Sequence, residues 1–385
     1  MQMTRTFDQV RLLVFAPTRR AASETFIRAN LKGLPFQLKA YFGDERPLSE
    51  PMRWLYGCAI WLSKLLTRLR LLRAAGLPAA WVARLLIRRH QPNVVLAEFG
   101  FEAVRVMHAC RWTGVPLVVH FRGSDASARQ RIGLLEDRYR SLLRIAAGII
   151  VKSRPMADRL ALLGASRDRI LISPSGADAA LFHHSAPAQS APIFLAVGRF
   201  VEKKGPLQTI DAFARMLAGC PALPADVQLW MVGDGPLLPA AQDLVQAQGI
   251  EDRVRLLGLR SQVEVAGLMR EVRAFVQHSR VAADGDSEGS PVAVMEAQLS
   301  GLPVIATRHA GIPEVVCDGE SGLLVEEGDV AAMALAMVRL VRDPGLAERM
   351  GACGRQRIQS GFTVSHHLEQ VSNFLETVHR SNRSA

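Results

Sequence analysis

The chain has 385 residues, of which 22% are charged and 49% are hydrophobic, values typical of a soluble globular protein. A chain of this length exceeds one ordinary hydrophobic core, which predicts two domains. Its five cysteines are widely spaced and form no Cys-x-x-Cys pair, which excludes a disulfide framework or a zinc knuckle as the organising principle and fits a reducing cytosol.

The net charge of +11 is distributed unevenly along the chain. Residues 1–180 contain 29 Lys and Arg against 13 Asp and Glu, a balance of +16, whereas residues 181–385 contain 18 against 23, a balance of −5. The first half of the chain is therefore expected to meet anions, and the second half is not.

The N-terminal residues MQMTRTFDQV are polar and lead directly into the strand-like segment RLLVFA. We expect no signal peptide, and no uninterrupted apolar run reaches the roughly 18 residues that a membrane span requires. These features predict a cytoplasmic protein.

Residues 53–92 contain no acidic residue and interleave cations with Trp, Tyr, Leu and Ile. The cations are Arg53, Lys64, Arg68, Arg70, Arg73, Arg84, Arg88 and Arg89. Helices of this composition could lie in the headgroup layer of an anionic membrane, here the inner face of the cytoplasmic membrane. The alternative is a set of ordinary domain helices whose arginines are solvated and whose apolar faces pack on a sheet.

Apolar, β-branched runs of strand length recur along the chain and alternate with segments of helical periodicity. This alternation is typical of parallel sheets covered by helices on both faces. The predicted strands are 12–16, 94–97, 117–121, 148–151, 171–173, 193–197, 227–232, 254–257, 274–277, 304–306 and 322–325.

A weakly apolar linker at 181–192 separates two series of strands, so the expected architecture is two doubly wound α/β domains. We place an N-terminal domain at 1–183 and a C-terminal domain at 184–360. The remaining residues, 361–385, contain an amphipathic segment at 366–378 that predicts a terminal helix, which could pack back on the N-terminal domain.

Ligands in such folds bind beyond the carboxyl ends of the strands, so the loops that follow strands are the candidate sites. In the N-terminal domain, His120 and Arg122 stand two residues apart at a strand end and face the same way. Either side chain could touch an acceptor or a phosphate if that face is open to ligand. A buried His120 with satisfied hydrogen bonds is the alternative.

In the C-terminal domain, a strand at 193–197 is followed by Gly198-Arg199 and then by Lys204-Gly205 before a helix. Arginine offers a planar fork that matches phosphate oxygens, and lysine offers a point charge. The two cations are therefore a candidate phosphate site, with a solvated basic loop as the alternative.

Two further loops contain glycine. Gly233-Asp-Gly235 follows the next strand and predicts a sharp connection into a helix. Asp284-Gly-Asp286 has the spacing of two carboxylates that can chelate a divalent metal, but no third ligand is in view and cations already match a phosphate charge nearby. We therefore expect no metal site.

Glu288 and Glu296 lie on either side of a predicted loop-to-helix junction. Pro291 suits the first helical position and Gly301 ends the helix, so Glu288 precedes the helix and Glu296 lies inside it. Glu296 is then roughly 7.5 Å along the helix axis from its start. The alternative is that both glutamates are solvated surface acids.

The start of that helix is a candidate anion site. The amides of Ser290, Val292 and Ala293 are expected to be unpaired there, and the helix dipole is positive at this end. A diphosphate bound to these amides would place its ribose near Glu296, and Glu288 could face the sugar beyond the phosphates.

Together these motifs resemble the retaining glycosyltransferases of family 4, which have the GT-B fold. They occur in the family's order: Gly198-Arg199, Lys204-Gly205, Gly233-Asp234-Gly235, Glu288-Gly289 with Pro291 and Glu296, Gly301-Leu302-Pro303-Val304, and Gly311-Ile312-Pro313-Glu314. Ser23-Glu24-Thr25-Phe26-Ile27 and HFRGSDAS at 120–127 are similar to the bacterial exopolysaccharide branch, which includes colanic acid and amylovoran transferases.

The resemblance implies two Rossmann-like domains facing across a cleft, with the acceptor bound by the first domain and a nucleotide-diphosphate sugar by the second. It implies a metal-independent hexosyltransferase that retains anomeric configuration. Arg199 and Lys204 would bind the diphosphate and stabilise the departing nucleotide, Glu296 would bind the ribose, and Glu288 would bind sugar hydroxyls. UDP is the default nucleotide, and GDP is possible.

The resemblance also assigns the remaining donor contacts. These come from Gly198, Gly233, Gly258, Gly289, Ser290, Pro291 and Val292. The branch usually has a histidine where Arg122 stands, so His120 is the candidate for the catalytic histidine of the first domain and Arg122 for a phosphate contact. The loop at 17–24 departs from the family's Gly-Gly pattern, which puts the phosphate contacts of the first domain in doubt.

The acceptor implied by the branch is a saccharide, commonly linked to polyprenyl pyrophosphate, which agrees with the basic, apolar segment at 53–92. Two other functional classes stay open. A sugar-nucleotide epimerase or a phosphorylase would share the fold, and a basic nucleic-acid-binding protein would share the sequence pI near 10.1. We expect no nucleic-acid partner, because the cations lie among leucines and tryptophans rather than on a polar stripe.

Overall fold

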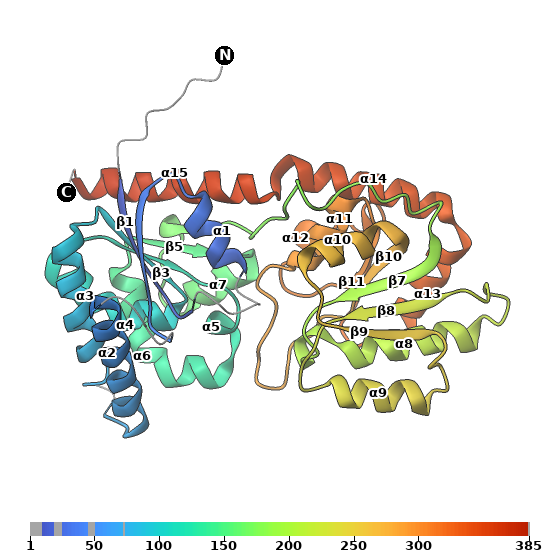
Figure 1. The fold of residues 1–385 in the computed structure, drawn as a ribbon, viewed down its shortest axis with the longest axis horizontal. Helices are drawn as coiled ribbons and strands as arrows, with labels where there is room; N and C mark the ends of the chain where they lie inside the picture. The colour runs from blue at the N-terminus through green and yellow to red at the C-terminus, as the bar shows by residue number, and fades with distance from the viewer. Residues whose placement is uncertain (1–9, 19–24, 45–50, 72–73, 384–385) are drawn as a thin grey trace, which may run out of the picture. The chain divides into compact units, whose positions relative to one another are not determined.

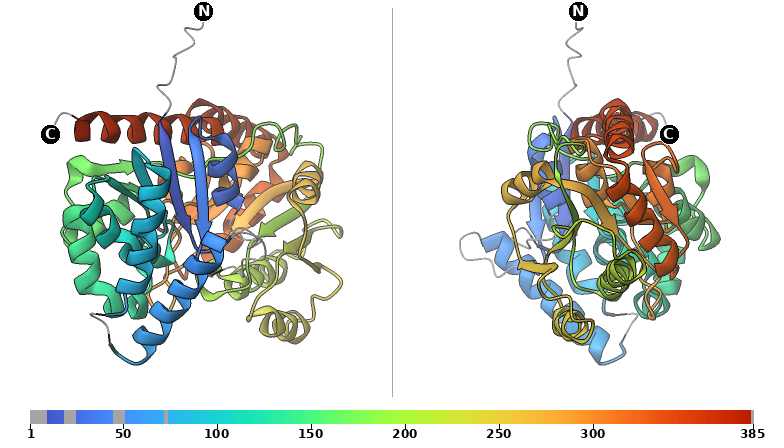
Figure 2. Two further views of the ribbon diagram at one scale, coloured as in Figure 1. Left: turned by 60° about the vertical axis from the view of Figure 1, so that its left-hand side comes forward. Right: turned by 90° about the vertical axis from the view of Figure 1, so that its right-hand side faces the viewer.

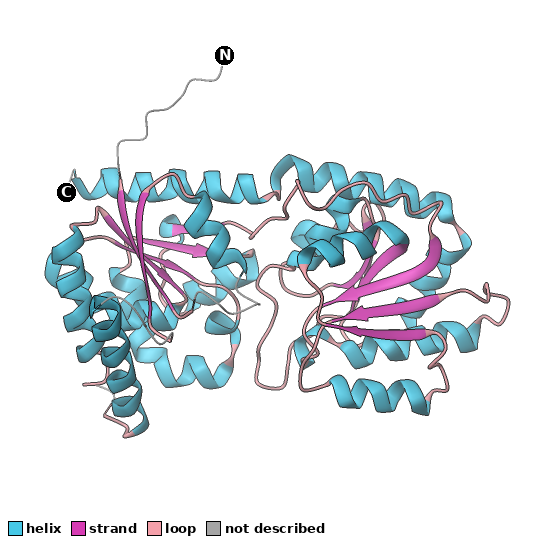
Figure 3. Cartoon of the chain, in the orientation of Figure 1, coloured by secondary structure: helices cyan, strands magenta, loops and turns pink. Residues whose placement is uncertain are grey.

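The computed structural model describes residues 10–18, 25–44, 51–71 and 74–383. The chain divides into two compact units, of which unit 1 comprises residues 1–173 and 367–385 and unit 2 comprises residues 174–366. Within the described residues each unit contains one six-stranded sheet with helices on both of its faces (Figures 1 and 3). The predicted class, two doubly wound α/β domains, is confirmed.

The sheet of unit 1 is parallel throughout, with the strand order β2-β1-β3-β4-β5-β6. Its strands are β1 (Arg11–Ala16), β2 (Gln37–Phe42), β3 (Val94–Glu98), β4 (Leu117–His120), β5 (Gly148–Val151) and β6 (Ile170–Ile172). Its helices are α1 (Thr25–Gly33), α2 (Pro51–Arg68), α3 (Leu77–His90), α4 (Gly100–Thr113), α5 (Ser124–Ser127), α6 (Arg129–Ile145) and α7 (Arg154–Leu162). The strand order reverses between β1 and β3.

Unit 2 has the strand order β12-β11-β10-β7-β8-β9, again parallel. Its strands are β7 (Ala191–Val197), β8 (Gln228–Val232), β9 (Val254–Gly258), β10 (Val272–Gln277), β11 (Val304–Thr307) and β12 (Gly322–Val325). Its helices are α8 (Pro206–Gly219), α9 (Leu238–Ala247), α10 (Gln262–Glu271), α11 (Val292–Ser300), α12 (Ile312–Val315), α13 (Val330–Arg342) and α14 (Pro344–Gly361). Here the order reverses between β7 and β10, which are neighbours.

The inner strands of both sheets, such as β3, β4, β10 and β11, bury both of their faces, which is typical of parallel sheets. In unit 1, Leu13 and Phe15 of β1 belong to a core with α2, α3, α4 and α6, whereas Leu12 and Val14 belong to a second core. The second core is completed by α15 (Val364–Arg383), which contributes Leu375 among others. In the left view of Figure 2, helix α15, in dark red, passes across the upper ends of the blue strands.

The edge strand β2 was not among the predicted strands. Its sequence QLKAYF places a lysine in the middle, and only Tyr41 of the strand is fully buried. An edge strand covered on one side lacks the continuous apolar run by which the other strands were recognised.

The division between the units differs from the predicted domain boundary at 183 and 184. The chain passes from unit 1 to unit 2 at residues 173 and 174, and it returns at 366 and 367. The segment that precedes β7 is part of unit 2 because Ala177 and Phe182 are buried in its core and Ser185 donates its backbone N–H to Ser300 O at 2.9 Å. The predicted linker at 181–192 therefore packs within unit 2.

Candidate donor site

The loop between β7 and α8 holds both predicted phosphate-binding cations. After Gly198 and Arg199, a short 3-10 turn, Glu202–Lys204, leads to Gly205, which has φ +55°. A Cβ on Gly205 would lie 1.9 Å from the backbone oxygen of His278, so only glycine fits this position. The close approach fixes the loop against the residue that follows β10.

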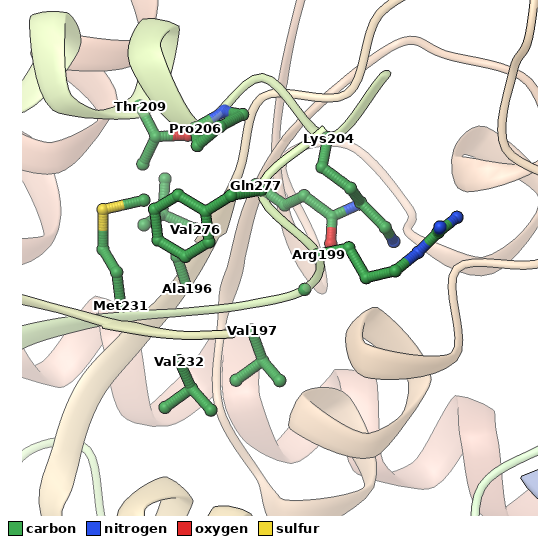
Figure 4. Close-up of a pocket in the computed structure, with 12 residues that line it drawn as sticks. Ala196, Val197, Arg199, Lys204, Pro206, Thr209, Met231, Val232, Val276 and Gln277 are labelled. Carbon is green, nitrogen blue, oxygen red and sulfur yellow. The ribbon is translucent and has the colours of Figure 1, made fainter. Parts of the chain in front are cut away.

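A pocket opens beside this loop, at the ends of the two central strands of unit 2. It is lined by residues from the ends of β7, β8 and β10 and from the loop and helix that follow β7. Figure 4 shows Arg199, Lys204 and Gln277 at one side of the pocket and Met231 and Thr209 at the other. Because β7 and β10 are the strands between which the order reverses, the pocket lies where ligands bind in doubly wound sheets.

The structure pairs Lys204 with Glu288. Nζ of Lys204 lies 3.0 Å from Oε1 of Glu288, whose side chain is buried. Burial raises the pKa of Glu288, but the charges of Lys204 and Lys203 outweigh burial, so the pKa lies below its ordinary value. Glu288 is therefore a carboxylate at neutral pH and accepts hydrogen bonds only.

The loop that carries Glu288 is held by a histidine. The backbone N–H of Glu288 donates to Nε2 of His309 at 3.1 Å, and Nδ1 of His309 lies 2.5 Å from Oε1 of Glu327. Since Nε2 accepts a hydrogen bond, the proton of a neutral ring is on Nδ1 and points to Glu327. His309 was not among the predicted site residues. It lies in the loop that follows strand β11, and loops that follow strands were the candidate binding sites.

Glu296 lies on the buried side of α11. Its carboxylate accepts a hydrogen bond from Nε2 of Gln262 at 3.4 Å. Burial raises its pKa to about 7, against the opposing effects of the Gln262 hydrogen bond and the charge of Lys204. The charge of Lys204 thus lowers the pKa of both predicted glutamates, and we call these three residues of unit 2 a charge cluster.

Helix α11 begins one residue later than predicted. Pro291 is its N-cap residue, with φ −80° and ψ 77°, and the first helical residue is Val292. The N–H of Val292 donates to Ser290 O at 2.9 Å, so the expectation that this amide is unpaired is wrong. The backbone N–H groups of Ser290 and Ala293 have no hydrogen-bond partner among the described residues. Gly289 precedes them and is buried.

Gly198, Gly233 and Gly258 bring the ends of three strands together. The N–H of Gly233 donates to Gly258 O at 2.9 Å, and a Cβ on Gly233 would lie 1.9 Å from Gly198 O. With φ +144°, Gly233 also has a backbone conformation that other residues rarely adopt. These glycines build the floor beside the pocket rather than offer side-chain chemistry.

The predicted residues of unit 1 form a separate, buried network. Arg122 donates from Nε and from one terminal nitrogen to Oε2 of Glu98, at 2.8 and 2.6 Å, and Nδ1 of His120 lies 3.4 Å from the same oxygen. The side chains of Glu98 and His120 are almost fully excluded from solvent. The guanidinium of Arg122 is thus engaged by Glu98, and His120 lies in the interior of unit 1.

The neighbours of His120 explain its protonation state. Burial lowers the pKa of His120 well below its ordinary value, and the charges of Arg122 and Lys152 lower it further. Lys152 is itself buried and donates to Ser173 O at 3.2 Å, while the hydroxyl of Ser173 lies 2.7 Å from Nδ1 of His367. Glu98 and Lys152, which the sequence-based prediction did not single out, each stand at or just after the end of an apolar strand.

Some predicted features lie outside the described residues. These are residues 19–24 of the loop after β1, with Ser23 and Glu24, together with Arg73 and the side chain of Arg53. In the described part of the chain, no group of three or more His, Cys, Asp or Glu side chains could hold a metal ion. Asp286 of the Asp-Gly-Asp sequence instead lies 2.9 Å from Nζ of Lys203.

The chain folds into two doubly wound units. In unit 2, a cationic pocket and two glutamates lie where the strand order reverses. This arrangement defines a glycosyltransferase of the GT-B fold. Two family models match the chain: Glycosyltransferase Family 4 over residues 40–181 and Glycosyl transferases group 1 over residues 179–357. The chain belongs to glycosyltransferase family 4.

Curated relatives include enzymes of bacterial polysaccharide synthesis. The chain is 31% identical over 292 residues to the putative colanic acid biosynthesis glycosyltransferase WcaL of Salmonella typhimurium, which covers 74% of this chain and 71% of that protein. It is 30% identical over 266 residues to the amylovoran biosynthesis glycosyltransferase AmsK of Erwinia amylovora, covering 67% of this chain and 63% of that protein. The chain thus spans about two thirds of these relatives.

Solved structures share the fold at low identity. Anabaena HepE in complex with UDP superposes with a TM-score of 0.72 at 16% identity, covering 96% of this chain and 100% of that one. Sucrose-phosphate synthase from Thermosynechococcus elongatus superposes with a TM-score of 0.76 at 18% identity, covering 97% and 100%. These likenesses confirm the GT-B fold.

Proposed function

We propose that the protein is a retaining hexosyltransferase that moves a sugar from a nucleotide-diphosphate sugar to a saccharide acceptor. The observation that carries this proposal is the cluster of Lys204, Glu288 and Glu296 beside Arg199, at the point where the strand order of unit 2 reverses. The cluster combines cations for a diphosphate with carboxylates for hydroxyl groups. That combination is complementary to a nucleotide sugar, which carries a diphosphate together with the hydroxyl groups of a ribose and a hexose.

The two cations would stabilise the leaving group. Arg199 is exposed and makes no ion pair with a described residue, so its guanidinium is available to phosphate oxygens. When the bond between the anomeric carbon and the phosphate oxygen breaks, the departing nucleoside diphosphate gains negative charge, which Arg199 and Lys204 would neutralise. On the same face of the sugar, the acceptor oxygen bonds to the anomeric carbon, and its proton passes to the leaving phosphate.

The two glutamates would hold the ends of the donor. Glu288 is an ionised carboxylate held by His309 and is suited to accept hydrogen bonds from sugar hydroxyls. Glu296 lies inside α11 and would accept from the ribose hydroxyls, with the diphosphate between them at the N–H groups of Ser290 and Ala293. Glycines 198, 233, 258 and 289 would let the donor approach the backbone closely.

For the nucleotide we propose UDP, with GDP as the second choice. The Anabaena relative of the same fold was solved with UDP. A GDP-mannose-dependent mannosyltransferase of Corynebacterium glutamicum is also related, at 28% identity over 217 residues. The transfer would need no metal ion, because Lys204 and Arg199 supply the positive charge that a divalent cation supplies elsewhere.

The acceptor would be a lipid-linked saccharide of exopolysaccharide synthesis, used at the inner face of the cytoplasmic membrane. The names of the colanic acid and amylovoran relatives support this assignment, as does the charge of +16 in residues 1–180. Unit 1 would bind this acceptor. A pyrophosphate-linked substrate is an anion, which a basic domain attracts.

A thermal-shift series with UDP, GDP and ADP tests the donor assignment. A ligand present at about 100 times its dissociation constant stabilises the protein by about 2.7 kcal/mol, which gives a measurable shift of the melting temperature. We expect one of the three nucleotides to give this shift, and no shift with any of them would contradict the proposal. An epimerase would convert a donor sugar by itself, whereas the proposed transferase releases nucleoside diphosphate only with acceptor present.

A further inference from the structure

Helix α2 has apolar residues on two opposite faces. Tyr56, Ala59 and Ile60 point into the core of unit 1. The helix packs against α3, and it lies on the outer side of unit 1 in Figures 1 and 2. On its other face the large apolar side chains are exposed: Trp54, Trp61, Leu62 and Leu65, followed by Leu69 just beyond the helix. We call these five residues the α2 stripe.

The α2 stripe covers one side of the helix. Trp54, Trp61 and Leu65 are separated by seven and four residues, so they lie within about 40° of one another around the helix axis, and Leu62 widens the stripe to about 100°. The two tryptophans are 61% and 66% exposed. Single exposed leucines, such as Leu162 in α7 and Leu335 in α13, are ordinary in proteins, but two tryptophans and two leucines on one helix face are not.

All charged residues of the chain segment that contains the α2 stripe are cations. The chain contains no Asp or Glu between residues 51 and 97. Lys64 lies 2.9 Å from Asp44, whereas Arg68 and Arg70 at the end of α2 are exposed and make no ion pair with a described residue. An apolar helix face bordered by unpaired cations is complementary to a lipid bilayer, which has an apolar interior and can have anionic headgroups.

The two other exposed tryptophans of unit 1, Trp81 and Trp112, differ from those of the α2 stripe because they have partners on unit 1. Trp81 of α3 packs against Trp112 with ring centroids 5.5 Å apart, and the guanidinium of Arg84 lies 5.3 Å from the Trp81 ring. The Trp81, Trp112 and Arg84 side chains therefore contact one another on the surface of unit 1. Trp54 and Trp61 of α2 have no ring or cation contact of this kind among the described residues, whereas the other exposed large apolar residues of α3 are the leucines Leu77 and Leu85. The structure therefore narrows the basic, apolar segment at 53–92 to the outward face of α2.

We propose that the α2 stripe docks into the headgroup layer of an anionic bilayer, with the indoles of Trp54 and Trp61 as its anchors. No helix in the described residues is long and apolar enough to cross a membrane, so α2 would lie in the plane of the interface. Tryptophan prefers this interface, and each cation near it is attracted to acidic lipids. The inference rests on the proposed lipid-linked acceptor, which it would bring within reach of unit 1.

A second copy of the chain is a poorer occupant of the α2 stripe. A twofold interface in which the two α2 helices run parallel would bring Arg68 and Arg70 of one copy near the same cations of the other, and in either orientation α2 itself has no acidic residue to pair them. Like charges across an interface oppose association. An anionic lipid surface instead offers the opposite charge to every cation along the helix.

Vesicle sedimentation with the full-length protein tests the proposal. The native protein should partition onto vesicles of phosphatidylglycerol and phosphatidylcholine at least about tenfold better than onto phosphatidylcholine alone, and raising the salt concentration should weaken this preference. The double variant Trp54→Ser/Trp61→Ser should partition about tenfold less onto the acidic vesicles. The matched control Leu162→Ser/Leu335→Ser, which removes two exposed leucines elsewhere, should partition like the native protein.

Three results would overturn the proposal. These are native-like partitioning of the tryptophan variant, equal partitioning of the native protein onto neutral and acidic vesicles, and a native dimer that the tryptophan variant converts to a monomer. A cooperative thermal unfolding transition in each variant would verify that both variants are folded. The nucleotide thermal shift, measured without vesicles, reports on the donor site separately, so a failure of the proposed transferase function would be distinguished from a failure of membrane docking.

Discussion

The backbone N–H of Glu288 donates a hydrogen bond of 3.1 Å to Nε2 of His309. This bond fixes the loop that presents the Glu288 carboxylate to Lys204, because His309 is itself held by Glu327 on its other nitrogen. The position of the carboxylate that we propose binds the donor therefore depends on a histidine that need not touch the donor.

His309→Ala tests this dependence. The substitution leaves the buried N–H of Glu288 without a partner, so we expect the free energy of unfolding to fall by about 1–3 kcal/mol. We expect turnover to fall by about tenfold, since a carboxylate displaced by a fraction of an ångström holds the donor less well. Steady-state kinetics and urea unfolding measure the two effects. Glu327→Gln keeps an acceptor for the histidine and should change both quantities much less; native turnover in His309→Ala would show that the loop is held by other contacts.

Arg199, Lys204 and Glu296 should differ in their kinetic effects. Arg199→Ala and Lys204→Ala each remove charge that stabilises the leaving diphosphate, so kcat should fall by about 10²–10³. Glu296→Ala removes contacts to the ribose that are present before and during the reaction, so it should mainly raise KM for the donor. Arg215→Ala, which removes an exposed cation of α8, is the control. Near-normal kinetics in all three site variants would be incompatible with the assigned site.

Glu296 should make the stability of unit 2 depend on pH. Its pKa is raised from 4.5 to about 7 by burial, so between these pH values the folded protein binds more protons than the unfolded chain. Stability should therefore fall as pH rises through this window, by at most about 3 kcal/mol. Urea unfolding of the native protein and of Glu296→Gln at pH 5 and pH 8 measures the difference. If both proteins lost the same stability, the titrating group would not be Glu296.

The proposed transfer should continue without divalent metal. Asp286 is paired with Lys203, and in the proposed site Arg199 and Lys204 would neutralise the diphosphate, so we expect chelation with EDTA to leave kcat unchanged. Asp284→Asn should also leave turnover within about twofold of native, because Asp284 is an exposed loop residue. A loss of activity on chelation that is restored by magnesium or manganese would refute metal independence.

Glu98 should be essential for the stability of unit 1. Its pKa is held below the ordinary value because the charge of Arg122, together with the hydrogen bonds that Arg122 donates, outweighs the effect of burial. Glu98→Gln would leave the charge of Arg122 buried without its partner, so we expect a loss of about 3–5 kcal/mol in the free energy of unfolding. Glu136→Gln, which breaks an exposed pair with Arg140, should cost about 1 kcal/mol or less. Equal losses in the two variants would mean that the buried pair contributes no more than a surface pair.

The sequence predicted most of the fold because the fold is encoded locally. Continuous apolar runs with β-branched residues, such as 304–306 and 322–325, are typical of strands buried on both faces, and glycines such as Gly205 and Gly301 mark places where the backbone takes positive φ. The same local character let the motif order of unit 2 indicate the family. The edge strand β2 and the boundary at residue 173 were missed because neither has a strong local pattern.

The tertiary structure alone decided which charges meet and which side chains are buried. Two ion pairs join residues that are distant in the sequence: Lys204 with Glu288, and Arg122 with Glu98. The raised pKa of Glu296 also depends on burial by residues from other parts of the chain. Likewise, the sequence showed that α2 is apolar and basic, but only packing showed that Trp54 and Trp61 face outward. Periodicity is a property of neighbouring residues, whereas burial and partner choice depend on the whole fold, and for that reason the motifs could be found from the sequence and their electrostatics could not.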